Sequence, residues 1–446
     1  MGRETTRNQV LGSYVKHLTL RDSLIPPSTL DIGHACLQLQ NDIEMYKTIR
    51  DTRYLNPRTS IPKDGSIHLA WEYAKDPAHH HLFIQMLRVS PYVFSVILEL
   101  IKKHDIFCNN SNVPQSPVDF QLAVTLFRMG RFGNAASVID IAREAGCSPG
   151  SVELFTERCF TAIESLHDIF VRPLTSDEKE VEKEWVDAHM GFKGLWRDGW
   201  VMYDGTIIVL YAHPGLDGDA YYTRKSNYGL NLQVSPTFCD KSCSMTLYKV
   251  GNVPSNLRIV DYSHGFTGSA YDATAFEHTA AHKHPDWFFE GEEFAWADSA
   301  YALNNRTIPV HRKPAAFRRE NTIFDKAVAH IHVRSEHCMS ALKGRFQCLR
   351  GLRVNINSPD DHIRACRWIT ISIILHNLII DVEGTASGQY FKPTHPTAQE
   401  MEDAGVHEEE EENEEEENAE ELEGEVKRRQ LTAELLAFRE TQGIPF

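Results

Sequence analysis

The chain has 446 residues, which predicts more than one folded part and leaves room for a large hydrophobic core. Its net charge of −16 comes from residues 400–425, which hold 16 acids and no Lys or Arg, so the other 46 acids balance 46 bases and a uniformly acidic protein is excluded. The nine cysteines form no CxxC pair, which excludes a disulfide framework or a zinc finger of the usual spacing and is typical of a reducing compartment.

The first half of the chain is helical in pattern. Residues 1–66 carry no decisive motif, and we expect a partly ordered segment there. Residues 67–170 predict an all-helical domain. Its expected helices cover residues 82–87, 92–104, 118–129, 136–145 and 150–169. Residues 171–199, which include an acid-base run, are expected to form a charged linker.

Within the helical domain, residues 138–155 fit a helix-turn-helix. Ala142 is small where two helices would touch, and Gly146 stands four residues later, where the turn needs a left-handed residue. Ser148 and Pro149 fit the N-cap and the first turn of a second helix. The alternative is an ordinary helical hairpin, because the second helix offers few bases to a phosphate backbone.

Residues 200–382 are predicted to form an α/β domain. β-forming residues dominate from Val201 to Tyr211, and a second short apolar run covers residues 294–297. Residues 327–351 have helical character.

Three acids in this region predict a metal site. Asp204 lies in the first β-rich run, Asp298 closes the second, and Glu336 lies in the expected helix. Carboxylates suit hard cations such as Mg²⁺ or Mn²⁺, and one or two such ions can clamp a phosphodiester. We therefore expect Asp204, Asp298 and Glu336 to be both catalytic residues and metal ligands.

The expected helix around Glu336 has two different faces. Glu336, Ser340, Lys343 and Gln347 share one face, because residues four and seven apart nearly eclipse. The other face offers apolar residues for burial, namely Val333, Met339, Leu342, Phe346 and Leu349. A carboxylate and an ammonium would then project together from one buried helix. The alternative is a surface charge pair without a further role.

Basic residues near each acid predict a groove for backbone phosphates. The DNA-binding candidates are Arg224, Lys225, Lys343 and Arg345. Ordinary surface charge is the alternative explanation for some of them. Asp272 is an accessory acid rather than a member of the triad. Asp261, Asp286 and Asp325 remain substitutes for the three main acids.

The C-terminal part combines an apolar run with an acidic tail. Residues 368–380 are too few to span a bilayer and predict a buried helix rather than a membrane protein. Residues 383–426 are expected to be an acidic disordered tail. Leu431, Leu435 and Phe438 recur at helical spacing, so residues 427–440 predict a short amphipathic helix, tethered flexibly and available to a partner.

A series of short motifs runs in order from Asp204 to Asn377. They are Asp204-Gly205-Thr206, Arg224-Lys225, Gly268-Ser269 with Asp272, Ala297–Tyr301, Arg334–His337, Leu342–Phe346, Leu349–Leu352 and Leu375–Asn377. In this order the series resembles the DDE superfamily endonuclease domain of PIF/Harbinger transposases and transposase-derived nucleases, with fungal members the most similar.

The resemblance implies an RNase H-like nuclease domain behind the helical domain. It implies metal-dependent cleavage of DNA phosphodiesters, with strand joining in a working transposase, and a contact between Lys343 and a DNA phosphate. It also implies a nuclear protein that a Myb-like helper would recruit and import, and we expect a homo-oligomer. The alternative is a domesticated protein that keeps the fold as a DNA-binding or interaction scaffold. The presence of all three acids favours the enzyme.

The chain departs from the resembled pattern in three places. Tyr271 stands where relatives have His, and Val310-His311 stands where they usually have Tyr. Residues 242–255 look inserted, either as an enlarged hairpin with a strand at 245–250 or as an unremoved intron. Residues 256–262 are expected to form the next strand.

Overall fold

A computed structural model of the protein describes residues 6–24, 32–52, 64–109, 112, 114–222, 228–230, 250–262, 284–384 and 419–443. The chain divides into two compact units, residues 1–62 and residues 63–446.

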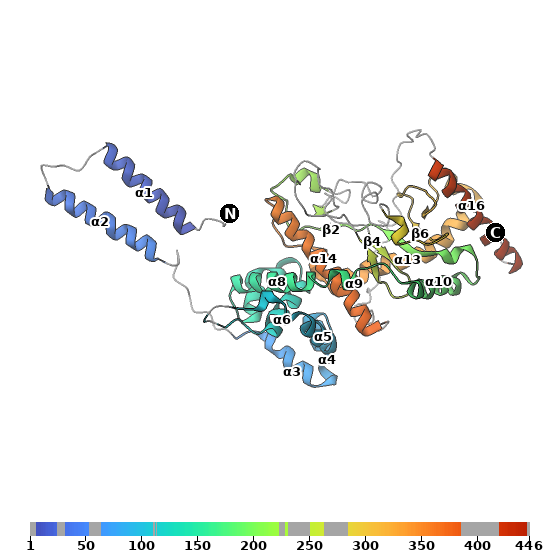
Figure 1. Ribbon diagram of the computed structural model, residues 1–446, viewed down its shortest axis with the longest axis horizontal. Coiled ribbons are helices and arrows are strands. Elements are labelled where there is room, and N and C mark those ends of the chain that lie inside the picture. The colour runs from blue at the N-terminus through green and yellow to red at the C-terminus, as the bar shows by residue number, and fades with distance from the viewer. Residues whose placement is uncertain are drawn as a thin grey trace. The chain divides into compact units, whose positions relative to one another are not determined.

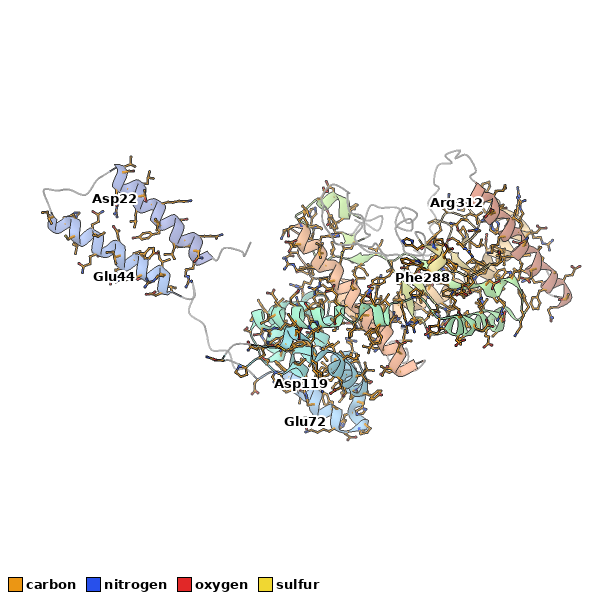
Figure 2. The ribbon with its side chains drawn as sticks, viewed as in Figure 1. Asp22, Glu44, Glu72, Asp119, Phe288 and Arg312 are labelled. Atoms are coloured by element: carbon orange, nitrogen blue, oxygen red, sulfur yellow. The ribbon has the colours of Figure 1, made fainter. Side chains whose placement is uncertain are left out.

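The first unit is a helical hairpin. It consists of α1 (Thr6–Leu24) and α2 (Ile32–Asp51), and Figure 2 shows Asp22 on α1 and Glu44 on α2. Arg21 holds the two helices together through a bidentate bond to Asp42, with N···O distances of 3.0 and 2.7 Å. No side chain of α2 is buried, so this unit has little core of its own.

The second unit begins with a group of helices. They are α3 (Leu69–Lys75), α4 (His80–Leu87), α5 (Pro91–Ile101), α6 (Val118–Met129), α7 (Val138–Ala145), α8 (Pro149–Glu164), α9 (His167–Phe170) and α10 (Ser176–Met190). Ser90 and Ser148 cap α5 and α8, and each helix has Pro in its first turn. Helices therefore fill most of the expected helical stretch.

Residues 171–199 are not a linker. The structure places α10 there, and a capping box between Thr175 and Glu178 starts it. One face of α10 is buried, including Val186, the ion-paired Lys179, and Glu182, which accepts hydrogen bonds from Ser255. The charge run that suggested a solvated linker belongs instead to a packed helix, because its acids and bases are paired across to other elements.

Helices α7 and α8 meet at the turn that the sequence indicated. Gly146 ends α7 in the left-handed region with φ 66°, and its N–H and that of Cys147 donate to the last turn of α7. Ala142 is buried at the contact between the helices. The turn itself is as expected, whereas a helix-turn-helix and its contact with DNA stay predictions.

A five-stranded mixed sheet follows. Its strands are β1 (Gly199–Asp204), β4 (Val250–Asn252), β5 (Ile259–Asp261), β6 (Phe294–Ala297) and β7 (Thr307–Pro309), and their spatial order is β5-β4-β1-β6-β7. β1 pairs antiparallel with β4 and parallel with β6, and β6 pairs parallel with β7. Two further strands, β2 (Ile208–Val209) and β3 (Gly229–Leu230), form a small ladder of their own.

Part of the segment expected as an insertion is a structural strand. β4 lies between β1 and β5, and Val253 directly after it is fully buried. Residues 250–252 are therefore part of the sheet, and this strand begins at the last residue of the 245–250 strand that the sequence indicated. Residues 242–249 lie outside the described part of the chain. The next strand, expected at 256–262, is β5.

Two long helices pack against the sheet and the helical group. They are α13 (Arg319–Arg345) and α14 (Pro359–Glu383), and Figure 1 shows α14 passing beside α8 and α9. α14 is long and apolar enough to cross a membrane, but 83% of its most apolar window is buried in the protein. It is thus the buried helix that the sequence predicted.

One core joins the helical group to the second long helix. The Phe160 ring of α8 packs edge-on against Trp368 of α14, with ring centroids 4.9 Å apart. Asn377 of α14 donates to the carbonyls of Phe170 and Ile259, at 2.9 and 2.7 Å. The two parts that the sequence suggested as separate domains therefore belong to a single compact unit.

The C-terminal helix is a packed element and not a flexible one. α16 (Ala419–Thr441) buries Leu431 completely and Leu435 nearly so. The indole of Trp196 donates to the Leu431 carbonyl at 2.9 Å, and the Glu434 carboxylate accepts from the Leu195 N–H at 2.8 Å. The expectation of a helix free for a partner is wrong, because its apolar face is already covered. The acidic segment 385–418 lies outside the described residues.

We expect Leu431→Ala to lower the free energy of unfolding by about 3 kcal/mol, since it removes a fully buried side chain and leaves a cavity. Leu422→Ala on the same helix is the control, because Leu422 is 60% exposed and should change stability by less than about 0.5 kcal/mol. Denaturant unfolding measures both. Equal stability of the two variants would mean that α16 does not contribute to the core in solution.

Candidate functional site

Two of the three acids leave the sheet at the same edge. Asp204 is the last residue of β1, and Asp298 directly follows β6. These strands are parallel neighbours in a register that pairs Val201 with Ala295 and Met202 with Trp296. Continuing that register places Asp204 level with Asp298, at roughly the 4.8 Å spacing of adjacent strands. Parallel pairing is thus what brings together two acids 94 positions apart in the sequence.

The third acid comes from α13. Glu336 is exposed on this helix, whereas Met339, Leu342 and Phe346 are buried as expected. Val333, expected on the buried side, is 41% exposed, so the sequence placed the boundary of the apolar face wrongly there. The helix itself begins at Arg319 and gives way at residue 346 to the 3-10 turn η10 (Gln347–Arg350), so Gln347 does not extend its polar face.

Two side chains of α13 bind the segment that carries Asp204. His332, one turn before Glu336, lies with Nε2 2.9 Å from the Tyr203 carbonyl. Lys343, two turns after Glu336, donates to the Thr206 hydroxyl at 2.6 Å and to the Ile207 carbonyl at 2.9 Å. Glu336 therefore sits on the helix between two contacts that fix α13 against the end of β1.

Further contacts anchor the same helix to β4 and to the loop after it. The buried Ser335 hydroxyl donates to Asn252 Oδ1 at 2.7 Å. Arg334 donates to the Pro254 carbonyl at 2.7 Å and to the Ser255 carbonyl at 3.2 Å. The two residues directly before Glu336 are thus structural, whereas the glutamate itself is exposed.

The electrostatics of Asp204 connect all three acids. Burial raises the pKa of Asp204, and the carboxylates of Asp298 and Glu336 raise this pKa further. His332 and the Gly205 N–H act in the opposite direction and hold the pKa down. The negative charge of the other two acids therefore reaches Asp204, which is what a shared site for a cation requires.

The carboxylate donor set suits a divalent metal. Among the residues that the structure describes, no three His, Cys, Asp or Glu side chains are arranged to hold a metal ion. A concentration of carboxylate charge that already raises the pKa of Asp204 is nevertheless relieved by a hard cation. The exposed Glu336 has several side-chain torsions with which to approach such an ion.

The predicted DNA-binding residues have different outcomes. Arg224, Lys225 and the accessory Asp272 lie outside the described residues. The Lys343 ammonium is hydrogen-bonded to Thr206 and Ile207. Arg345 is 5% exposed and donates to the Arg88 carbonyl at 2.9 Å, and burial lowers its pKa to about 10. Such a buried guanidinium holds the fold together and does not favour the predicted contact with a phosphate.

The three substitute acids, Asp261, Asp286 and Asp325, make contacts different from those of the main acids. Asp325 accepts from the backbone N–H of His311 at 3.0 Å and lies 2.8 Å from its Nδ1. Asp286 is exposed in a short 3-10 turn, and Asp261 accepts from the neighbouring Tyr262 N–H. The residue that sequence reasoning missed is His332, although its spacing of four from Glu336 already placed it on the same helix face.

Residues 203–377 match the family model of the DDE superfamily endonuclease. The match supports a transposase-like nuclease, for which DNA is the implied substrate and a divalent metal the usual cofactor. Its span contains Asp204, Asp298 and Glu336. A search of curated proteins found no match, and neither did a search of solved structures.

The raised pKa of Asp204 predicts that Asp204→Asn stabilises the metal-free protein at pH 7. The unfolded chain has an ordinary carboxyl pKa, so above that value the charged carboxylate destabilises the folded state, and this penalty disappears below a pH of about 4. Thermal melting in chelator should therefore show a higher Tm for the variant at pH 7 and a shrinking difference on acidification. Asp64→Asn, at an exposed position, is the control. A Tm at or below that of the wild type at pH 7 would contradict the electrostatic account.

The contacts of Lys343 predict a role in positioning. Lys343→Met should weaken Mn²⁺ binding several-fold, because α13 is no longer fixed to the segment that follows Asp204. Calorimetry with Mn²⁺ measures this effect. A phosphate contact would instead show itself in DNA binding, where losing one such contact reduces the salt dependence by about one unit. Unchanged Mn²⁺ affinity together with a reduced salt dependence would restore the role implied by the family resemblance.

Proposed function

We propose that the protein is a metal-dependent DNA endonuclease of the PIF/Harbinger transposase type, similar to fungal members, with Asp204, Asp298 and Glu336 as its catalytic acids. The observation that carries the proposal is the meeting of Asp204 and Asp298 at the carboxyl ends of adjacent parallel strands, with Glu336 electrostatically coupled to Asp204. All three acids lie in the region that matches an endonuclease family.

The sheet supports an RNase H-like fold for the nuclease part. Three consecutive strands of the sheet, β1, β4 and β5, pair antiparallel, and the two later strands β6 and β7 add in parallel on the other side of β1. The first acid ends the central strand, the second follows its parallel neighbour, and the third stands on a helix that packs on the sheet. This arrangement collects oxygen ligands from distant parts of a chain.

One or two Mg²⁺ or Mn²⁺ ions, held by the three carboxylates, would supply activation of the attacking oxygen and neutralisation of charge on the phosphodiester. The protein contributes the geometry. β1 and β6 fix the two aspartates, while His332 and Lys343 fix the helix that bears Glu336. The partial burial of Asp204 would strengthen its interaction with a cation. No Ser, Cys or His is assigned a covalent role.

Strand joining, partners and location extend this proposal. A DNA 3′-hydroxyl in place of water would join strands, as in a working transposase. The exposed face of α8 includes Glu153 and Leu154, and its Glu157 is paired with Arg367 of α14, so α8 offers little to a DNA backbone. Poor recognition by the α7–α8 turn supports a Myb-like helper that brings the protein to DNA and into the nucleus, with a homo-oligomer as the assembled form.

The decisive experiment compares conservative variants of the three acids. Asp204→Asn, Asp298→Asn and Glu336→Gln should each lower Mg²⁺- or Mn²⁺-dependent cleavage of duplex DNA by at least about 100-fold, since each keeps its shape but loses a negative ligand. Gel assays of nicking measure the rate, and circular dichroism checks the fold. Glu320→Gln, an exposed change at the start of the same helix α13, is the matched control and should cleave normally.

A domesticated scaffold would give a different pattern. Wild-type protein that binds DNA but shows no metal-dependent cleavage, with the three variants indistinguishable from it, would overturn the enzyme and support the scaffold. Retained cleavage in one variant only would remove that residue from the triad and leave the others.

A further inference from the structure

A second charged site lies away from the three acids, in a small cleft between the helical group and the segment after α13. The cleft is lined by Arg128 and Arg131 from the end of α6 and by Arg353 from the segment after η10, with Cys348 and Trp368 beside them. Three guanidinium groups therefore come together from two parts of the chain that are more than 200 residues apart. Neither the proposed chemistry nor the family match assigns them a role.

Two of these arginines are held in place by an aromatic ring and one hydrogen bond. The guanidinium of Arg128 lies 4.9 Å from the ring centroid of Trp368 and donates to the Thr156 hydroxyl at 3.0 Å. Each arginine has five N–H groups, so a single bond of this kind leaves most of its donor capacity for another group. A guanidinium that is held in place loses little side-chain entropy when it binds a ligand.

Arg353 repeats this arrangement on the other wall of the cleft. Its guanidinium lies 4.1 Å from the ring centroid of Tyr211 and donates to the Gly133 carbonyl at 2.8 Å. The guanidinium of Arg131 lies 4.4 Å from the Phe127 ring. Each of the three guanidinium groups therefore lies at cation–π distance from an aromatic ring.

The charge of this cluster is not neutralised by neighbouring acids. Within the described part of the chain, no carboxylate lies within 4.0 Å of the guanidinium of Arg128, Arg131 or Arg353. Glu153 acts on Arg128 only from a distance. Two other acids of α8, Glu157 and Glu164, are paired with Arg367.

Burial and like charge make the cluster electrostatically unfavourable on its own. Burial lowers the pKa of Arg128. Burial, together with the charges of Arg131 and Arg350, lowers the pKa of the neighbouring Arg88 to about 10. Burial raises the pKa of the Cys348 thiol to about 12, so the thiol is neutral at pH 7 and does not offset the arginines. An anion bound among them would relieve this repulsion.

We propose that this arginine cleft, defined by Arg128, Arg131 and Arg353, binds a phosphate of the DNA backbone beside the cleavage site. The assignment to DNA rests on the proposed function and on how the chain connects the two sites. Asp204 and Tyr211, on which Arg353 stacks, are seven residues apart in one segment. Seven extended residues span at most about 24 Å, the length of roughly seven base pairs, so one duplex can reach both sites.

The segment between the two sites is hydrogen-bonded to the residue next to Arg353. The Leu352 N–H donates to the Val209 carbonyl at 2.8 Å, and the Tyr211 N–H donates to the Leu352 carbonyl at 3.0 Å. These bonds fix the position of Arg353 relative to the strand that leads back to Asp204. The cleft would therefore set the register of the DNA on the protein without reading its sequence.

The test measures DNA binding in chelator, where no cleavage occurs. Arg131→Gln should weaken binding of a 30-base-pair duplex about threefold to tenfold at low salt and lower the slope of log Kd against log salt by about one unit. Arg353→Gln should do the same, and the double variant should lose about two units. Arg131 comes first because Arg353 also donates to a backbone carbonyl, so its loss can disturb the fold. Fluorescence anisotropy measures affinity, and thermal melting checks folding.

Arg429→Gln is the matched control, because Arg429 is 76% exposed on α16 and paired with Glu425. It should leave the slope unchanged. A slope for Arg131→Gln equal to that of the wild type and of this control would overturn the proposal.

A second arm uses inorganic phosphate at matched ionic strength. Stabilisation of the wild type by phosphate that Arg131→Gln abolishes, with DNA affinity unaffected, would assign the cleft to free phosphate and overturn the DNA assignment.

The outcome is separable from that of the proposed function. A wild type that never cleaves DNA but binds it with the arginine-dependent salt slope would refute the nuclease and keep the cleft. A wild type that cleaves, with arginine variants that bind like the wild type, would refute the cleft and keep the nuclease.

Discussion

The parallel pairing of β1 with β6 is the constraint on which the rest of the candidate site depends. Parallel neighbours end at the same edge of a sheet, so the strand pairing alone brings together the acids that terminate them. An antiparallel pairing of the same two strands would send Asp298 to the opposite edge. The backbone ladder, rather than any side-chain interaction, is therefore what makes a two-aspartate site available.

Placing carboxylates this close destabilises the metal-free fold, and the surrounding contacts offset that cost. Burial and two neighbouring negative charges raise the pKa of Asp204. His332 and Lys343 of α13 bind the backbone on either side of Asp204, and Ser335 binds β4. The unfavourable electrostatics of Asp204 are thus offset by neutral or cationic side chains of α13, the helix that carries Glu336. Such an arrangement is typical of sites that bind a cation.

The same helix links the candidate site to the arginine cleft. α13 ends at Arg345, and the chain then passes through η10 to Arg353, while α14 presents Trp368 beneath Arg128. Because α14 also shares a core with α8 and α9, the helical group and the sheet belong to one compact unit. A ligand that contacts the helical group is therefore held in a fixed relation to the acids, which a flexible linker would not have allowed.

The sequence by itself determined the local elements and the chemical types at the site. Caps and apolar periodicity gave α5, α7, α8 and the buried α14, and local motifs singled out the three acids. Tertiary structure alone decided which surfaces were covered. Residues 171–199, expected to be a charged linker, contain the packed helix α10. The C-terminal amphipathic helix packs on the rest of its own chain, and the Arg345 side chain is buried. Charge and periodicity describe one segment at a time, whereas burial depends on contacts between segments far apart in the chain.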